Sequence, residues 1–186
     1  MGDTSQTGWQ LMALKSAELC GEEIPGETRT DVHRFLRSVG SGQFGGLASY
    51  RPHFQASRSM TAEAMYCRQL INDQVSPQAA QEAAIYLLGE LPGRGEMNLY
   101  YWYYGTLCLY YQQGEAWERW NAALKETLLK TQIREGEGTG SWNATTVWGG
   151  YGGRVYCTSM AAMNLEVYYR FLPIHIEQAQ RGEVVR

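Results

Sequence analysis

The sequence lacks the features that mark several classes of protein. No apolar run reaches the ~18–20 residues that a helix needs to cross a bilayer, and no basic-then-apolar leader opens the chain. Neither sign of charge is in large excess, because 16 Lys and Arg against 19 Asp and Glu leave a formal charge of −3. Nucleic-acid binders usually carry a basic patch, so this balance argues against nucleic acid as a partner. We expect a soluble domain with no transmembrane segment.

Cysteine and histidine are few, and neither has the spacing of a metal site. The 4 cysteines form no CxxC pair and have no histidine at ligand spacing. Each lies in an apolar, helix-like stretch, which favours buried free thiols over a disulfide or a metal role. We therefore expect no metal and no cofactor. The cysteines are Cys20, Cys67, Cys108 and Cys157.

Apolar and aromatic residues, by contrast, are plentiful. Hydrophobic residues make up 44% of the 186 and charged residues 19%, which provides for a buried core and suits one domain. The 13 tyrosines and 6 tryptophans have polar tips, and such side chains are typical of wet cavities and interfaces. The 21 glycines cluster between helix-like segments and indicate tight loops.

Apolar residues recur mostly with the 3.6-residue period of a helix, and strand patterns are nearly absent. Three predicted helices have one polar and one apolar face, and they lie near residues 28–39, 77–90 and 115–132. Thr28 and Asp31 are expected to cap the first of them as a pair, and Ser76 with Pro77 to start the second. The apolar stripe of the third consists of Trp117, Trp120, Leu124 and Leu128.

Other predicted helices are apolar or small on nearly all sides, as expected of helices buried on several faces. They lie near residues 6–20, 59–72, 98–113 and 155–171. Leu99 to Tyr111 is the extreme case, and we expect a last helix around 174–180. The chain thus alternates buried and half-exposed helices joined by glycine-rich loops. This alternation predicts an all-α fold, 1–186 as a single domain of antiparallel helix pairs in an α-solenoid or a closed α/α ring.

One loop carries a recognisable motif. The segment LLKTQIREGEGTGSW, Leu128 to Trp142, has Gln132, Gly140 and Trp142 at the places that they have in the QW motif of squalene-type cyclases. The chain therefore resembles the prenyltransferase and squalene-oxidase repeat family, which includes the terpenoid cyclases. More specifically, it resembles the C-terminal part of uncharacterised repeat proteins from planctomycete-type bacteria.

The resemblance implies an α/α toroid with inner and outer helices. A complete ring in that family has roughly six helix pairs, and each unit of a repeat array needs stacked neighbours. With four inner helices, the chain would form a partial ring. It would then be a piece of a longer protein, an open arc with a concave face, or half of a homodimer that completes the ring.

The catalytic residues of the family do not carry over to this chain. The only aspartates are Asp3, Asp31 and Asp73, so there is no DxDD acid and no Asp-rich magnesium motif. The zinc set of Asp, Cys and His found in protein prenyltransferases is missing as well. The sequence therefore favours a protein that is not an enzyme.

Two carboxylates are weaker catalytic candidates. Glu63 and Glu166 lie within apolar helices, where a buried carboxylate with a raised pKa could act as a general acid. The alternative is an ion pair, of Glu166 with Arg170, or of Glu63 with Arg58 or Arg68.

Aromatic side chains are the candidates for ligand binding. They would line a central cavity and present π-faces to a polyprenyl chain or carbocation, or they would fill the core. Gly149 to Gly153 would form a mobile loop before Arg154, where a lid or binding loop could lie. The predicted ligand-binding residues are Trp9, Tyr66, Tyr100, Tyr103, Tyr104, Arg154 and Tyr156, with Trp102 as a further aromatic of the same group.

One glycine pattern is set aside. Gly40 to Gly45 fits GxGxxG, but it follows a helix pattern and precedes a loop, whereas a dinucleotide site needs a strand before it and a helix after it. The function expected overall is a non-catalytic repeat module that binds a partner protein or an apolar, isoprenoid-like ligand on its concave face. The alternative is a terpenoid cyclase-like or prenyltransferase-like enzyme of isoprenoid metabolism, or the C-terminal part of one.

Overall fold

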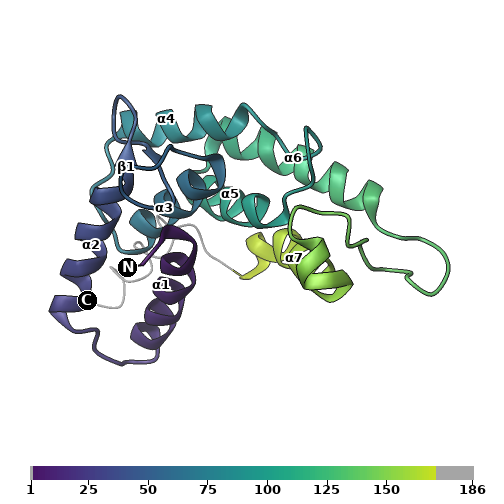
Figure 1. The fold of residues 1–186 in the computed structure, drawn as a ribbon, viewed down its shortest axis with the longest axis horizontal. Helices are drawn as coiled ribbons and strands as arrows, with labels where there is room; N and C mark the ends of the chain where they lie inside the picture. Colours follow the sequence, from purple (N-terminus) through teal and green to yellow (C-terminus); the bar gives the residue numbers. More distant parts are fainter. Residues whose placement is uncertain (1, 171–186) are drawn as a thin grey trace, which may run out of the picture. The chain divides into compact units, whose positions relative to one another are not determined.

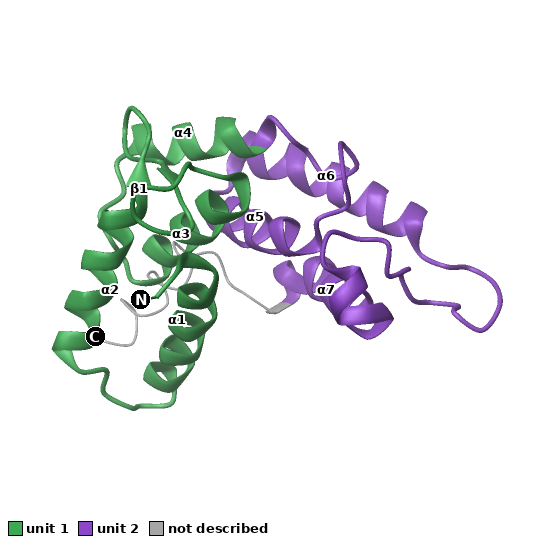
Figure 2. Ribbon diagram, in the orientation of Figure 1, with its two compact units in different colours: residues 1–87 green, residues 88–186 purple. Residues whose placement is uncertain are grey.

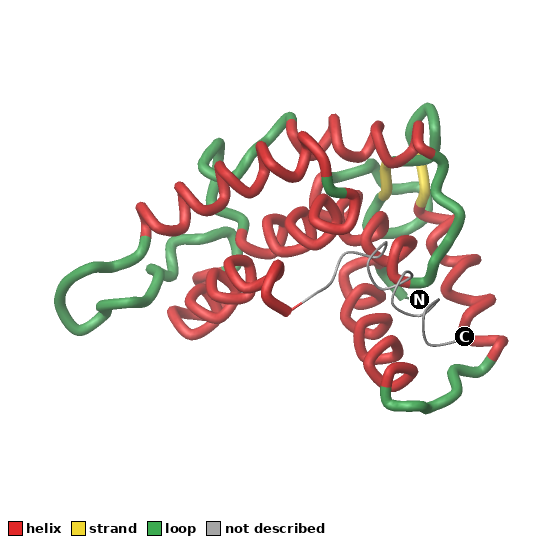
Figure 3. Tube along the Cα trace, turned by 180° about the vertical axis from the view of Figure 1, so that it is seen from behind, coloured by secondary structure: helices red, strands yellow, loops and turns green. Residues whose placement is uncertain are grey.

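The computed structural model describes residues 2–170, and helices dominate this part of the chain (Figure 1). The expected all-α fold is confirmed, since the described sheet is a single hairpin of two-residue strands (Figure 3). The helix expected around 174–180 lies outside the described residues. The chain divides into two compact units, Met1–Leu87 and Leu88–Arg186 (Figure 2). The arrangement of helix pairs into a toroid stays a prediction.

The first unit is built around its third helix. Its elements are α1 (Thr4–Leu19), α2 (Gly26–Val39), β1 (Gly40–Ser41), β2 (Leu47–Ala48), α3 (Arg58–Leu70) and α4 (Pro77–Leu88). Helix α3 packs on α1 and on β2, and every residue from Met60 to Cys67 is buried. The expectation of a helix buried on nearly all sides is therefore confirmed for α3.

Polar side chains set the starts of three of these helices. Asp3 caps α1 by accepting a hydrogen bond from the Gln6 amide, and Ser57 caps α3 in the same way. The Ser76 hydroxyl accepts a 3.1 Å hydrogen bond from the Ala79 amide, so Ser76 and Pro77 start α4 as predicted.

The predicted capping pair of α2 is wrong. The helix begins at Gly26, directly after Pro25, and it has no side-chain cap. The fixed φ of proline, here −55°, suits the entry into a helix, so α2 starts two residues before Thr28. Asp31 lies inside the helix and pairs with Arg34 at 2.5 Å.

Helix α1 is less buried than the sequence predicted. Only Thr4, Gly8 and Leu11 are buried along it, and Leu19 is 66% exposed. Cys20, expected to be a buried thiol, is exposed, while the other three cysteines are buried and free as expected. The reason is that, among the described helices, α1 packs closely only on α3 and makes few contacts with α2.

The second unit has its most apolar helix in the middle. Its helices are α5 (Leu99–Gln112), α6 (Gly114–Thr131) and α7 (Gly149–Arg170). Helix α5 packs on both α6 and α7 (Figure 1). Apart from the half-buried Tyr100, all residues from Leu99 to Tyr111 are buried, as predicted. The predicted apolar stripe of α6 is buried as well.

A buried polar network joins the three helices of the second unit. The Trp120 indole of α6 donates a 2.9 Å hydrogen bond to the Thr106 hydroxyl of α5. That hydroxyl donates to the Trp102 carbonyl at 2.6 Å and lies 3.2 Å from the side-chain oxygen of Asn164. The Asn164 amide of α7 donates to the Leu99 carbonyl at 3.2 Å. Such satisfied networks fix the positions of the helices that they connect.

Candidate functional site

The predicted ligand-binding residues belong to both units. Trp9 lies on α1 and is 37% exposed, whereas Tyr66 on α3 is 1% exposed. In the second unit the Tyr103 and Tyr104 rings of α5 lie 5.5 Å apart, edge to face, and the Tyr100 ring lies 5.2 Å from that of Tyr104. The structure therefore brings three of the predicted tyrosines together on one helix.

The tyrosines of α5 pack as part of the protein interior. Tyr104 is 0% exposed, and its neighbours Trp102 and Tyr103 are also buried. Tyr156, on α7, is half-buried, and burial followed by the charge of Cys157 raises its pKa to about 12. These contacts match the core-filling alternative. Tyr100, which is only partly covered, is the α5 tyrosine that a ligand reaches most easily.

The two candidate carboxylates have different surroundings. Glu63 is completely buried on α3, one turn before Cys67. Burial and, secondly, the charge of Glu63 raise the pKa of the Cys67 thiol. Glu166, on α7, is only half-buried. Glu63 is therefore the one that has the surroundings expected of a buried acid.

One of the ion pairs considered for Glu63 is not formed. Arg68 pairs instead with Asp73, with its Nε 3.2 Å from a carboxylate oxygen, and it donates a 2.9 Å hydrogen bond to the Gly45 carbonyl. Arg58 donates to the Tyr86 carbonyl at 3.2 Å.

The loop expected before Arg154 is largely helical. A helical turn runs from Gly149 to Gly152, and a break follows at Gly153, where φ is 68° and ψ is −170°. Glycine adopts this conformation without a steric penalty. Arg154 is exposed, and it donates a 3.2 Å hydrogen bond to the hydroxyl of Ser141. The segment is thus a kinked helix start, and the mobile-loop prediction is wrong there.

Helix α7 carries the most exposed apolar side chains of the described chain. Tyr151 is 91% exposed, Val155 79% and Tyr169 81%. Trp148, just before the helix, is 49% exposed, and its ring lies 6.3 Å from that of Tyr151. The opposite side of the helix is buried, at Cys157, Met160, Ala161, Asn164 and Val167. One face of α7 therefore packs on α5, and another presents apolar side chains to solvent.

Sequence reasoning missed this exposed face for a physical reason. The residues of α7 are apolar or small on nearly all sides, and that composition predicts burial everywhere. It cannot show that, among the helices that the structure describes, only α5 packs closely on α7.

A second feature that the sequence did not predict is the partner of the glycine-rich loop. The loop between β1 and β2 directs three backbone N–H groups at the carboxylate of Glu82 on α4. The donors are the amides of Gln43 at 2.6 Å, Phe44 at 3.0 Å and Gly46 at 2.8 Å. The GxGxxG spacing was the available signal, but helix α2 precedes the motif and strand β2 follows it, so a dinucleotide site stays excluded.

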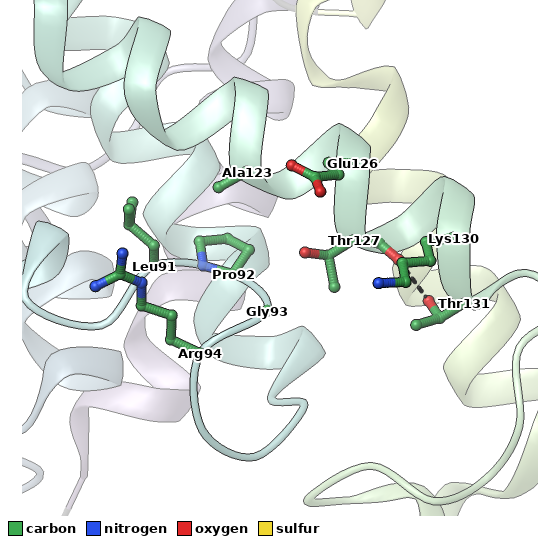
Figure 4. A pocket seen from close by; sticks show the side chains of 9 residues that line it. All are labelled: Leu91, Pro92, Gly93, Arg94, Ala123, Glu126, Thr127, Lys130 and Thr131. Atoms are coloured by element: carbon green, nitrogen blue, oxygen red, sulfur yellow. Dashed lines mark hydrogen bonds between the residues drawn. The ribbon is translucent and has the colours of Figure 1, made fainter.

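A pocket of about 450 Å³ lies in the second unit, between the loop after α4 and helix α6 (Figure 4). Two cationic side chains, those of Arg94 and Lys130, stand on opposite sides of it (Figure 4). The Thr131 hydroxyl at its edge donates a 2.8 Å hydrogen bond to the Thr127 carbonyl. The lining residues are Leu91, Pro92, Gly93, Arg94, Ala123, Glu126, Thr127, Lys130 and Thr131, and the predicted site residues are not among them.

Metal sites and membrane-spanning helices are both missing from the described part of the chain. Within residues 2–170, no three His, Cys, Asp or Glu side chains come together as a metal site, and no helix has the length and apolar character of a membrane span. No family model, curated protein or solved structure matches this chain.

Proposed function

We propose that this chain is a non-catalytic α/α repeat module that binds a partner protein or an apolar, isoprenoid-like ligand through the inner-helix face that includes α7. The observation that carries the proposal is the exposed side of α7, with Tyr151, Val155 and Tyr169 each at least 79% exposed. The family resemblance supports the same assignment, because the inner helices of an α/α toroid line its concave face.

Covering the exposed apolar side chains of α7 would be favourable in free energy. Burying one large apolar side chain completely is worth about 1.5–3 kcal/mol, so a ligand that covers several of them gains substantial binding free energy. Val155 and Tyr169 lie about four helical turns apart along α7, so an elongated apolar ligand or a partner helix would be needed to cover both. The tyrosines also carry hydroxyl groups, which suit an interface that stays partly wet.

Native mass spectrometry of protein purified from its own host tests this proposal. We expect the wild-type chain to carry a lipid, a partner protein or a second copy, and to gain mass when geranylgeraniol is added as an isoprenoid probe. The double variant Val155→Ser, Tyr169→Ser should lose the bound species. Ile85→Ser is the matched control, because Ile85 is 64% exposed on α4 in the other unit, and it should keep the bound species. A wild-type chain that stays a bare monomer in every arm would disprove the proposal.

A second candidate is an enzyme of isoprenoid metabolism, and the complete burial of Glu63 favours it. A carboxylic acid buried among apolar helices is the kind of group that can protonate a carbon–carbon double bond. The test is turnover of squalene by wild type, Glu63→Gln and Glu166→Gln, with helicity measured by circular dichroism. Loss of turnover in Glu63→Gln alone, at unchanged helicity, would support the enzyme. Full activity of both variants would reject a role for either carboxylate.

A further inference from the structure

The hairpin loop of the first unit has the geometry of an oxyanion receptor. Gly42 and Gly45 have φ values of +93° and +74°, which turn consecutive N–H groups toward one point. Three amides converge there, at 2.6, 3.0 and 2.8 Å from the two oxygens of Glu82. Concave sets of backbone amides of this kind bind phosphates and carboxylates in many proteins.

The glycines also leave the space that the anion needs. A Cβ at Gly42 would lie 2.7 Å from both oxygens of Glu82, so any side chain there would exclude the carboxylate. At Gly46 a Cβ would lie 2.2 Å from the Ala79 carbonyl oxygen, which would push the loop away from α4. The loop therefore accepts an anion only with glycine at these positions.

The loop amides are the partners that the described part of the chain gives to the Glu82 carboxylate. Within the described residues, no cation pairs with its carboxylate. The bonds from Gln43 and Phe44 are open to solvent, so dissolved ions reach them. Burial alone would raise the pKa of Glu82, but the loop amides lower it, so the resident carboxylate is ionised at neutral pH. Arg68, paired with Asp73, donates a hydrogen bond to the Gly45 carbonyl and so holds the loop from its other side.

We propose that the loop Gly42–Gly46 is a binding site for a small oxyanion of the phosphate or carboxylate class, and that Glu82 is its displaceable resident. When a free oxyanion takes the three amides, the contact between the hairpin and α4 opens. Phe44, 51% exposed in the same loop, moves with it. The hairpin thereby connects oxyanion binding to the position of an exposed aromatic side chain.

Backbone amide shifts of the full chain, measured by NMR, test this directly. Inorganic phosphate and acetate are titrated separately at pH 7, with sodium chloride keeping the ionic strength constant. We expect saturable shifts at the Gln43, Phe44 and Gly46 amides. Glu82→Gln should bind phosphate about tenfold more tightly, because a neutral resident amide makes weaker hydrogen bonds than a carboxylate.

Two further variants sharpen the result. Glu126→Gln removes an exposed carboxylate of α6 in the second unit, so it should bind phosphate as the wild type does. Gly42→Ala should abolish the saturable shifts, because it fills the anion position. Equal shifts with chloride alone would overturn the proposal. Binding by Glu82→Gln but not by the wild type would overturn it too, because Glu82 would then be a fixed part of the fold.

Discussion

The indole nitrogen Nε1 of Trp142 lies 2.9 Å from the carbonyl oxygen of Leu128 and donates a hydrogen bond to it. Leu128 is in the last turn of α6, and its carbonyl also accepts a 3.1 Å hydrogen bond from the amide of the C-cap residue Gln132. In the same loop the Gln132 side chain donates to the Gly140 carbonyl at 2.9 Å. The Gln132 and Trp142 side chains of the QW-like segment thus hold its loop against the C-terminal end of α6, and both have a structural role here.

Replacing that donor should lower the stability of the second unit. Trp142→Phe keeps an aromatic ring but removes the indole hydrogen bond, while the Gln132 amide still donates to the Leu128 carbonyl. The loss should therefore be that of one ordinary hydrogen bond, about 0.5–1.5 kcal/mol in free energy of unfolding. Urea unfolding followed by circular dichroism measures the loss. Trp148→Phe is the control, because Trp148 is 49% exposed, and its effect should stay within about 0.5 kcal/mol. Equal stability of the two variants would contradict the structural role of Trp142.

The sequence predicts features that depend on residues close together in the chain, but not contacts between residues far apart in it. The stripe of α6 and the burial of α5 follow from periodicity and composition, and both are confirmed. The contact of Glu82 with Gln43 spans 39 residues, and no local pattern encodes such a pairing. Periodicity also cannot say which apolar helix lacks a neighbour, so the exposure of Val155 on α7 was not predictable.

The candidate ligand-binding residues were likewise predictable only as far as local sequence patterns reach. Composition marked the tyrosines of α5 as a cavity lining or as core, and the rings of Tyr100 and Tyr104 meet because residues four apart on a helix are neighbours. It could not decide between a cavity wall and packed core, because that depends on which helices cover α5. Sequence reasoning also grouped Trp9 with these residues, although Trp9 belongs to the first unit.

A close contact between α5 and α6 gives a second prediction. A Cβ at Gly105 would lie 2.4 Å from Cζ2 of Trp120, whose indole is fixed by its hydrogen bond to Thr106. Gly105→Ala should therefore destabilise the protein by about 1–3 kcal/mol through overpacking, against the usual gain of about 1 kcal/mol for alanine in a helix.

Two further variants test whether the clash with Trp120 is the cause of this destabilisation. A Cβ at Gly150 would meet no atom within 4 Å, so Gly150→Ala should leave the urea midpoint unchanged or raise it slightly. In a Trp120→Phe background the ring atoms that cause the clash are absent, so the added cost of Gly105→Ala should fall. Full additivity of the two substitutions would show that the clash is not the cause.

Acid should weaken the first unit through Glu18. Hydrogen bonds from Lys15 and then Arg29 lower the pKa of this carboxyl group to about 2, from an ordinary value of 4.5. A carboxyl group with a lowered folded-state pKa stabilises the fold above its unfolded pKa, and this contribution is lost as the pH falls toward 2.

Urea unfolding of wild type and Glu18→Gln between pH 6 and pH 2 measures this effect. The variant should be less stable at pH 6 and should approach the wild type at low pH. Glu118→Gln, at an exposed position of α6, should follow the wild type throughout. A constant difference between wild type and Glu18→Gln at every pH would rule out titration of Glu18 as the cause.

Thiol reactivity reports whether the surroundings of Glu63 open to solvent. Cys20 is exposed, whereas Cys67, Cys108 and Cys157 are buried, and burial raises the pKa of the Cys67 and Cys108 thiols. Because the thiolate is the reactive form, Ellman's reagent should modify Cys20 rapidly and the others only as the protein unfolds. Cys20→Ser should show no fast phase.

The slow phase then distinguishes a packed core from a ligand cavity at α3. Cys67 lies one turn from Glu63, so any opening that admits an isoprenoid to that carboxylate also admits the reagent to the thiol. In a Cys20→Ser background, a packed core predicts that Cys67 reacts no faster than global unfolding. A phase faster than unfolding, absent in Cys67→Ala and suppressed by geranylgeraniol, would instead indicate an accessible cavity beside Glu63 and favour the enzyme over the binding module.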